Sequence, residues 1–422
     1  MTRRPFLVVA CLAAFAGVAI AALPVAAQSD GTQSDGAQSD GTASSTSTPP
    51  VGDPGVYVQE LPADQIEAAP SGVTLFVGTG SADVDGAPVS TVSIGSSAEF
   101  AESVQGASPA LTVAVEQFFT QGGTTAIVQL VTDESAPSLV AAVAGSVAEV
   151  RAWDLLVVPA MNGLDGESWV SLANEMGQAA GRATGIALLD PPSSVAQPSD
   201  PEWASALVAV VEPVRQSPAA GSMAMLSSSL VLLDGQTVSS AAVLAGLFAA
   251  TDRSSGPWAP AGGPSQPMRG LTAAVPANNS QATVLAAGGI NSIMALPTIG
   301  TIVMGDRTLS TDVSTQDLSR QRMLDFLRRS IATGLQPYVF EPDGPATWAS
   351  VVEQIEGFLT TQWTDGGLFG ATASRAFDVV ASEGASMTAE QIDQGLMVVE
   401  VEVSLEDGEA SLQFTQQVQP PN

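Results

Sequence analysis

The spacing of apolar residues divides the chain from residue 72 onwards into alternating predicted strands and helices. Short, continuous apolar runs predict buried strands within 72–80, 126–131, 154–160 and 184–190. Apolar residues three and four positions apart predict helices within 109–121, 137–150, 200–214 and 238–253. Strands that alternate with helices are typical of a parallel sheet with both faces covered. The larger part of the chain is therefore predicted to be an α/β domain.

The pattern changes beyond residue 310. Apolar positions at helical spacing predict two amphipathic helices, 318–331 and 348–363, joined by a short aromatic strand that ends at Pro342. Further strands are predicted within 376–381, 395–405 and 411–418. In the second of these, polar and apolar side chains alternate, and the apolar face consists of Met397, Val399, Val401 and Val403. Such a half-buried pattern predicts an antiparallel sheet in a separate α+β domain.

The N-terminus has the features of an export signal. Arg3 and Arg4 precede an apolar run over 6–23, and small residues at 25–27 suit cleavage after Ala27. We expect a signal peptide over 1–27, for the general or the twin-arginine route, with an uncleaved membrane anchor as the alternative. Residues 28–53 repeat Gln-Ser-Asp-Gly and are predicted to be a flexible linker. Cys11 is the one cysteine, so a disulfide within the chain is excluded.

Charge and composition exclude several classes of function. The chain has 43 acidic and 13 basic residues, a net charge of -30, and no histidine; every basic residue is an arginine. A basic footprint for nucleic acid is absent, so we expect no direct nucleic-acid contact. Without His and Lys the usual general bases, Schiff-base amines and metal ligands are missing. The sequence therefore predicts a protein that is not an enzyme and that needs no cofactor or metal.

Two groups of charged residues remain as candidates for function. Glu341 and Asp343 form a carboxylate pair, but Pro342 between them favours a corner in which Asp343 caps the next helix. The one basic cluster in this acidic chain consists of four arginines on a predicted helix, Arg320, Arg322, Arg328 and Arg329. They form either a solvated helix face or a patch that meets the acidic surface of another subunit.

The chain contains, among other motifs, PGVYVQEL, TLFVGTG, AVEQFFTQGGTTAIVQLV, INSIMALP, GTIVMGDRTLS, SIATGLQPYVFEPDGPATW and GFLTTQWTDGGLFGA. Together these motifs resemble one known family, the contractile tail sheath proteins of phages and related injection systems. They occur in the family's order over about residues 54–422. The resemblance implies a subtilisin-like α/β sheath domain followed by an α+β C-terminal sheath domain. The name describes shape alone, because a subtilisin-type triad requires a histidine.

The resemblance also implies an architecture for assembly. It implies an N-terminal arm over 54–72, a subtilisin-like domain over 73–310, a C-terminal domain over 311–411 and a C-terminal arm over 412–422. The expected arm strands lie at Val56, Tyr57 and Val58 and at Leu412, Phe414 and Val418. Such arms add strands to sheets of neighbouring subunits and link them into a helical tube. The implied partners are further copies of the chain, an inner tube protein and baseplate proteins.

The export signal departs from the family pattern, because sheath proteins ordinarily assemble in the cytoplasm. It supports a second hypothesis, an exported surface-layer or filament protein that reuses the sheath fold. The expected location is therefore the periplasm, cell surface or medium, with a virion tail or cytoplasmic assembly as the alternative.

Overall fold

The computed structural model describes residues 65–84, 87–150, 152–195 and 202–421. The predicted signal peptide, the linker and the arm residues Val56, Tyr57 and Val58 lie outside these ranges. Within them, no helix is long and apolar enough to cross a membrane.

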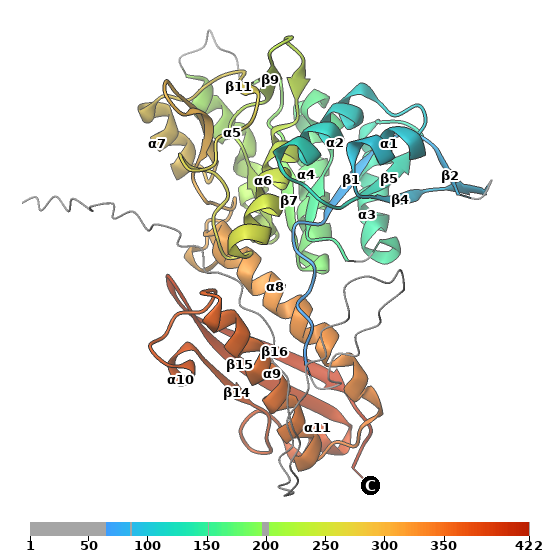
Figure 1. Ribbon diagram of the computed structural model, residues 1–422, viewed down its shortest axis with the longest axis vertical. Coiled ribbons are helices and arrows are strands. Elements are labelled where there is room, and N and C mark those ends of the chain that lie inside the picture. The colour runs from blue at the N-terminus through green and yellow to red at the C-terminus, as the bar shows by residue number, and fades with distance from the viewer. Residues whose placement is uncertain (1–64, 85–86, 151, 196–201, 422) are drawn as a thin grey trace, which may run out of the picture. The chain divides into compact units, whose positions relative to one another are not determined.

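A six-stranded sheet forms the centre of the first domain, with the strand order β4-β5-β1-β6-β7-β8 (Figure 1). Its strands are β1 (Thr74–Thr79), β4 (Thr91–Ile94), β5 (Ala126–Val131), β6 (Leu155–Val157), β7 (Ile186–Leu189) and β8 (Met223–Met225). Every pairing is parallel except that of β4 with β5. The parallel α/β domain predicted from the sequence is confirmed.

Helices cover both faces of this sheet. The helices are α1 (Ser97–Ser103), α2 (Pro109–Gln121), α3 (Ala136–Glu149), α4 (Gly166–Ala183), α5 (Trp203–Arg215), α6 (Ser240–Ser255) and α7 (Asn279–Ala287). Phe76 of β1 packs on one side in a core with α2 and α6. Its neighbours Leu75 and Val77 pack on the other side with α3, α4 and α5. The alternation of β1 side chains between two cores explains its continuous apolar run.

Local signals in the sequence set the ends of α2. The Ser108 hydroxyl accepts a hydrogen bond from the Leu111 N–H at 3.2 Å, and Pro109 occupies the first helical position. The helix ends at Gly122, whose φ of 119° suits glycine. A Cβ at this position would also lie 2.8 Å from the Cβ of Ala250 on α6. Gly122 therefore ends α2 and lets it pack closely against α6.

Small strands complete the α/β domain, and short 3₁₀ turns occur in both domains. The pairs and triples are β2 (Ala82–Val84) with β3 (Ala87–Val89), β9 (Leu230–Leu232) with β10 (Thr237–Val238) and β11 (Leu271–Ala273), and β12 (Ser292–Leu296) with β13 (Gly300–Met304). The 3₁₀ turns are Pro159–Gly163, Ala220–Ser222, Val313–Thr315 and Gln336–Phe340.

The 3₁₀ turn Gln336–Phe340 replaces the aromatic strand that was predicted to end at Pro342, so that prediction is wrong. Pro337 at its start lacks an N–H for a strand ladder, and Phe340 is 80% exposed.

The C-terminal domain is a three-stranded antiparallel sheet packed against two long helices (Figure 1). Its elements are α8 (Leu318–Gly334), α9 (Pro345–Thr364), α10 (Ala373–Ala376), β14 (Phe377–Val380), α11 (Ala389–Asp393), β15 (Leu396–Leu405) and β16 (Gly408–Gln417). The predicted apolar face of β15 is buried against α8 and α9. The α+β end domain and both of its amphipathic helices are confirmed.

The predicted C-terminal arm over 412–422 requires a correction. Residues 412–417 belong to β16, which pairs antiparallel with β15 of the same chain, so that Leu412 lies opposite Val401. Leu412 and Val418 are 3% and 2% exposed and lie in the domain's own core. Leu412 and Phe414 share one face of β16, so folding buries Leu412 and half-buries Phe414 against the monomer's own core, which Val418 joins just after the strand.

This correction leads to a stability prediction. Leu412→Ala should lower the free energy of unfolding by about 2–5 kcal/mol, because it opens a cavity in the C-terminal core. Gln413→Ala is the matched control, since removing this exposed side chain should change the free energy of unfolding by less than about 0.5 kcal/mol. Urea unfolding followed by circular dichroism measures both. Equal, small effects would mean that residues 412–418 lie outside the monomer's core.

Candidate assembly interface and domain joint

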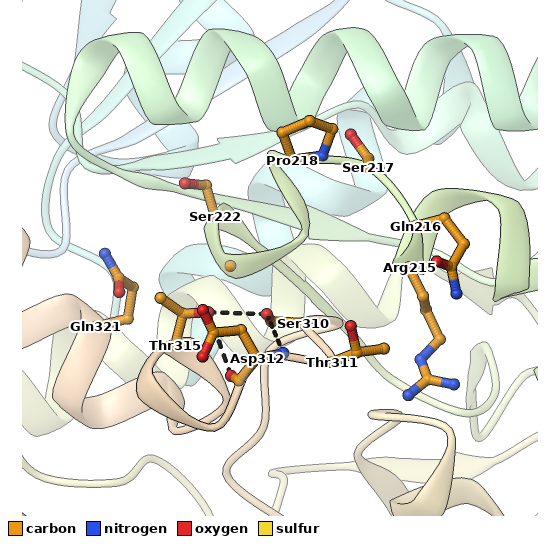
Figure 2. Close-up of a pocket in the computed structure, with 11 residues that line it drawn as sticks. Arg215, Gln216, Ser217, Pro218, Ser222, Ser310, Thr311, Asp312, Thr315 and Gln321 are labelled. Carbon is orange, nitrogen blue, oxygen red and sulfur yellow. Dashed lines mark hydrogen bonds between the residues drawn. The ribbon is translucent and has the colours of Figure 1, made fainter.

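The pocket drawn in Figure 2 contains no catalytic arrangement. It encloses about 350 Å³ between residues 215–222 and 310–321. Its cation, Arg215, is paired with Glu212 at 2.9 Å. Its hydroxyl groups bond within the wall: Thr315 Oγ1 donates to Ser310 Oγ at 2.8 Å, and Ser310 Oγ accepts from the Asp312 N–H at 3.0 Å. The pocket therefore lacks a base placed to activate one of its hydroxyl groups as a nucleophile.

At the carboxyl end of the parallel sheet, a buried acid is occupied by hydrogen bonds that stabilise the fold. Open α/β sheets usually bind ligands at this edge. Here Asp190, directly after β7, accepts hydrogen bonds from Ser240 Oγ at 2.9 Å, the Ala241 N–H at 3.0 Å and the Ser239 hydroxyl. Burial raises the pKa of Asp190, while these donors act in the opposite direction. The carboxylate therefore fixes the start of α6 instead of facing a ligand. Among the described residues, no group of acidic, His or Cys side chains could hold a metal ion.

The carboxylate pair Glu341 and Asp343 has a structural role, although not the expected one. Asp343 does not cap α9; its Oδ1 accepts a hydrogen bond from Trp348 Nε1 at 2.6 Å. Its backbone N–H donates to the Gln419 carbonyl at 2.7 Å, and the Glu341 carbonyl accepts from the Gln419 N–H at 2.9 Å. Burial raises the pKa of Asp343. Glu341 and Asp343 therefore fix the C-terminal segment at Gln419 through backbone hydrogen bonds.

Arg320, the first arginine of α8, holds the β15–β16 hairpin. Its guanidinium pairs with the Asp407 carboxylate and donates to the Glu409 carbonyl at 2.8 Å. The Arg320 side chain is 11% exposed. It therefore has little surface left for another subunit.

Arg322 reaches in the opposite direction, into the α/β domain. Its Nη2 lies 2.6 Å from Asp252 Oδ2 on α6 and 3.7 Å from Asp154 Oδ2 before β6. Its Cζ lies 4.1 Å from the centre of the Phe248 ring. The three charged side chains are at most 5% exposed. The guanidinium thus combines ion pairing with a cation–π contact inside the protein.

Arg329, two turns further along α8, makes a second connection to the α/β domain. Its Nη2 lies 3.9 Å from Asp154 Oδ2, and its Nη1 donates to the Thr184 carbonyl at the end of α4. Arg328 instead pairs within α8, with Asp325 at 2.9 Å, and keeps a side chain that is 37% exposed. The same helix side meets the chain before β1, because Ser330 Oγ accepts from the Ala69 N–H at 2.9 Å.

The predicted intersubunit patch of four arginines is therefore wrong as a surface feature. Arg322 and Arg329 connect two domains of one chain, Arg320 holds a hairpin, and Arg328 alone stays substantially exposed. Sequence reasoning missed the acidic partners Asp154 and Asp252. Asp154 directly precedes the buried strand β6, and this position was the available signal for a buried acid.

The feature best suited to assembly is the outer edge of the C-terminal sheet. In the described residues β16 pairs with a strand on one side only, β15. Beside it lies a groove of about 830 Å³, lined on the β16 side by Leu412, Gln413 and Phe414. Its other walls include Ala332 of α8 and Trp153 of the α/β domain. An edge strand with unpaired backbone groups can accept a further strand.

The fold matches that of sheath proteins. Residues 310–419 match the family model of the phage tail sheath C-terminal domain. A chain of the anti-feeding prophage baseplate is 24% identical with a TM-score of 0.66, and the alignment covers 87% of this chain and 99% of that one. A chain of the anti-feeding prophage helical sheath in the contracted state is 25% identical with a TM-score of 0.66, covering 83% and 95%. Among curated proteins, none matches the sequence.

A more distant structure shows the same fold. The sheath tail protein from Desulfitobacterium hafniense is 9% identical with a TM-score of 0.58, covering 86% of this chain and 100% of its own. The fold of this chain is therefore that of the sheath proteins of contractile injection systems. The resemblance to sheath proteins found in the sequence is confirmed, most directly over residues 310–419.

Removing Arg322 tests the internal role of the α8 arginines. Arg322→Met should cost about 3–5 kcal/mol of unfolding free energy, because it leaves Asp154 and Asp252 buried without their shared cation. Arg182→Met is the matched control, since Arg182 is 47% exposed and pairs with Glu175 on the surface. Chemical denaturation of both variants measures the difference. Similar small losses would show that Arg322 is not a buried ion-pair partner.

Asp325 on α8 predicts a pH dependence of stability. Burial raises its pKa from 3.8 to about 6, although Arg328 and Arg329 oppose the shift. The folded state therefore binds this proton more tightly than the unfolded state, and stability is lost as the pH rises through about 6. Asp325→Asn should flatten this loss, which totals roughly 3 kcal/mol from below pH 3.8 to above pH 6, with about half of it falling between pH 5 and pH 8.

The measurement is urea unfolding on either side of that pKa, near pH 5 and near pH 8, with exposed Asp365→Asn as the control. The control should follow the wild type. An Asp325→Asn protein that loses as much stability as the wild type would contradict the assignment.

Proposed function

We propose that this protein is a sheath subunit that polymerises into a helical tube by strand exchange between copies. The observation that carries the proposal is the single-sided pairing of β16, beside the groove that Leu412, Gln413 and Phe414 line. Each copy would offer this edge and also supply a strand to another copy. Such a contact uses two different surfaces and does not close on itself, so it extends into a helix of subunits.

The N-terminal arm is the proposed donor strand. Val56, Tyr57 and Val58 are β-prone and stand between prolines, and they precede the described chain by a few residues. The C-terminal residues 412–418 are already used within the monomer's own sheet, so they act as the acceptor. At about 0.5–1.5 kcal/mol net per backbone hydrogen bond, a strand of this length contributes several kcal/mol to each joint.

The partners follow from the matched assemblies. Those proteins come from a baseplate and from a contracted helical sheath, which supports a tube of this chain attached to a baseplate. An inner tube protein within it remains the expectation from the family resemblance. The net charge of -30 would make assembly depend on salt, since like charges on adjacent subunits repel unless they are screened.

A second candidate function keeps the same assembly in a different place. The predicted signal peptide and linker favour an exported surface-layer or filament protein that reuses the sheath fold. The cell fraction and the mature N-terminus distinguish the two candidates. A protein found in the cytoplasm with residues 1–27 still attached would exclude the exported candidate and favour a sheath of the injection type.

Deletion of the arm tests the proposed joint. A chain of residues 28–422 without 54–60 should stay monomeric, because the donor strand is gone, while its thermal unfolding stays unchanged. Deleting 28–53 instead is the matched control and should leave tubes intact. Light scattering and electron microscopy over a range of salt concentrations measure both. Normal tubes from the chain without 54–60 would overturn strand donation by this arm.

A further inference from the structure

The groove beside β16 is basic, although the chain as a whole is strongly acidic. Three arginines line it, Arg182, Arg328 and Arg329, and no acidic side chain of the described residues does. The full chain carries 43 acidic and 13 basic residues. Positive potential in a hollow of this kind attracts negatively charged groups of a partner. The groove therefore favours an acidic ligand.

Two of these arginines, Arg182 and Arg328, have donors left for such a ligand, and we call them the groove arginines. Their side chains are 47% and 37% exposed. Arg182 Nη2 donates to Glu175 at 3.1 Å, and Arg328 Nη1 donates to Asp325 at 2.9 Å. Within the described part of the chain their other guanidinium nitrogens make no hydrogen bond. Because a guanidinium has five N–H donors, each groove arginine can bind a further carboxylate.

Arg329 connects the two helices that carry the groove arginines. Arg182 lies in the last turn of α4, and Arg328 lies on α8. The Arg329 guanidinium donates to the carbonyl of Thr184, directly after α4. This bond ties the end of α4 to α8, so that an arginine of the α/β domain and one of the C-terminal domain line the same groove. A ligand that fills the groove therefore contacts both domains.

The rest of the groove suits an extended segment with apolar side chains. Trp153 and Phe414 line it, beside the edge of β16. A strand over the proposed donor arm would place Val56, Val58 and Glu60 on one face, because every second side chain of a strand points the same way. Glu60 is the one charged residue of this arm strand. The arm therefore matches the groove both in apolar character and in charge.

We propose that the groove arginines bind the Glu60 carboxylate of the arm that a second copy donates. This inference rests on the proposed strand exchange and names the contact that selects the arm. Backbone pairing along β16 accepts any extended segment, because the main chain is the same in every sequence. The contact between Glu60 and the groove arginines distinguishes this arm from uncharged or basic segments. It also joins each donated strand to both domains of the acceptor.

Charge reversal on the two sides of the contact tests it in the chain of residues 28–422. Arg182→Glu combined with Arg328→Glu should raise the concentration at which tubes form by about tenfold or more, and Glu60→Arg should do the same. A chain with all three changes should recover most of the lost assembly, because the reversed charges attract each other again. Light scattering against protein concentration at one fixed salt concentration gives these values, and electron microscopy identifies tubes.

Two variants control for the change of charge itself. Glu67→Arg alters the charge as Glu60→Arg does, but Glu67 lines a different cavity, beside Pro337. Arg307→Glu combined with Arg375→Glu replaces two exposed arginines that lie outside the groove lining. Both controls should form tubes at close to the wild-type concentration. Thermal unfolding of each variant shows whether it is folded, and Glu60→Arg tests the contact from the arm even if the groove variants unfold.

The outcomes separate this contact from strand exchange in general. If the wild type forms tubes and Glu60→Arg forms them at the same concentration, the contact is overturned and strand exchange stands. Loss of assembly in the groove variants alone would then mean that the groove binds another acidic segment. A chain with all three changes that assembles as poorly as its parents would also contradict a direct pairing. A wild type that stays monomeric would overturn the proposed function, and this contact with it.

Discussion

The contact between Arg322 and the two carboxylates of Asp252 and Asp154 determines how the rest of the chain can be arranged. It places the N-terminal half of α8 against the end of α6. It also brings Asp154 within reach of the Gly72 N–H, so the segment that enters β1 is fixed at the same point. With α8 held in this way, its other face forms the core of the C-terminal domain. A buried ion pair stabilises little by itself, but it specifies one relative placement of two domains.

That placement determines what the surface offers for assembly. The same α8 that reaches Asp252 through Arg322 reaches the β15–β16 hairpin through Arg320. The free edge of β16 is therefore held in a fixed position beside the groove shared with the α/β domain. The buried acids Asp190 and Asp343 serve the fold, since Ser, backbone and Trp donors bind their carboxylates.

Much of the fold could be predicted from the sequence, because apolar periodicity reports burial directly. The continuous run of β1 and the alternation along β15 each correspond to observed strands. Apolar periodicity did not predict the position of Arg322, because that position depends on contacts with residues far away in the chain. Arg322 lies off the apolar stripe of α8, and only the fold shows that its partners come from 70 and 168 residues earlier in the chain. The family resemblance favoured an arm at Leu412, although Leu412, Phe414 and Val418 already showed the alternation of a monomer strand.

The most direct test of strand exchange is a cryo-electron microscopy reconstruction of the polymer formed by residues 28–422. Strand exchange predicts a helical tube in which an additional strand lies against β16, contributed by Val56–Glu60 of a neighbouring copy. A tube in which the outer edge of β16 carries no strand would contradict strand exchange. A chain that remains monomeric at every salt concentration would contradict the assembly itself.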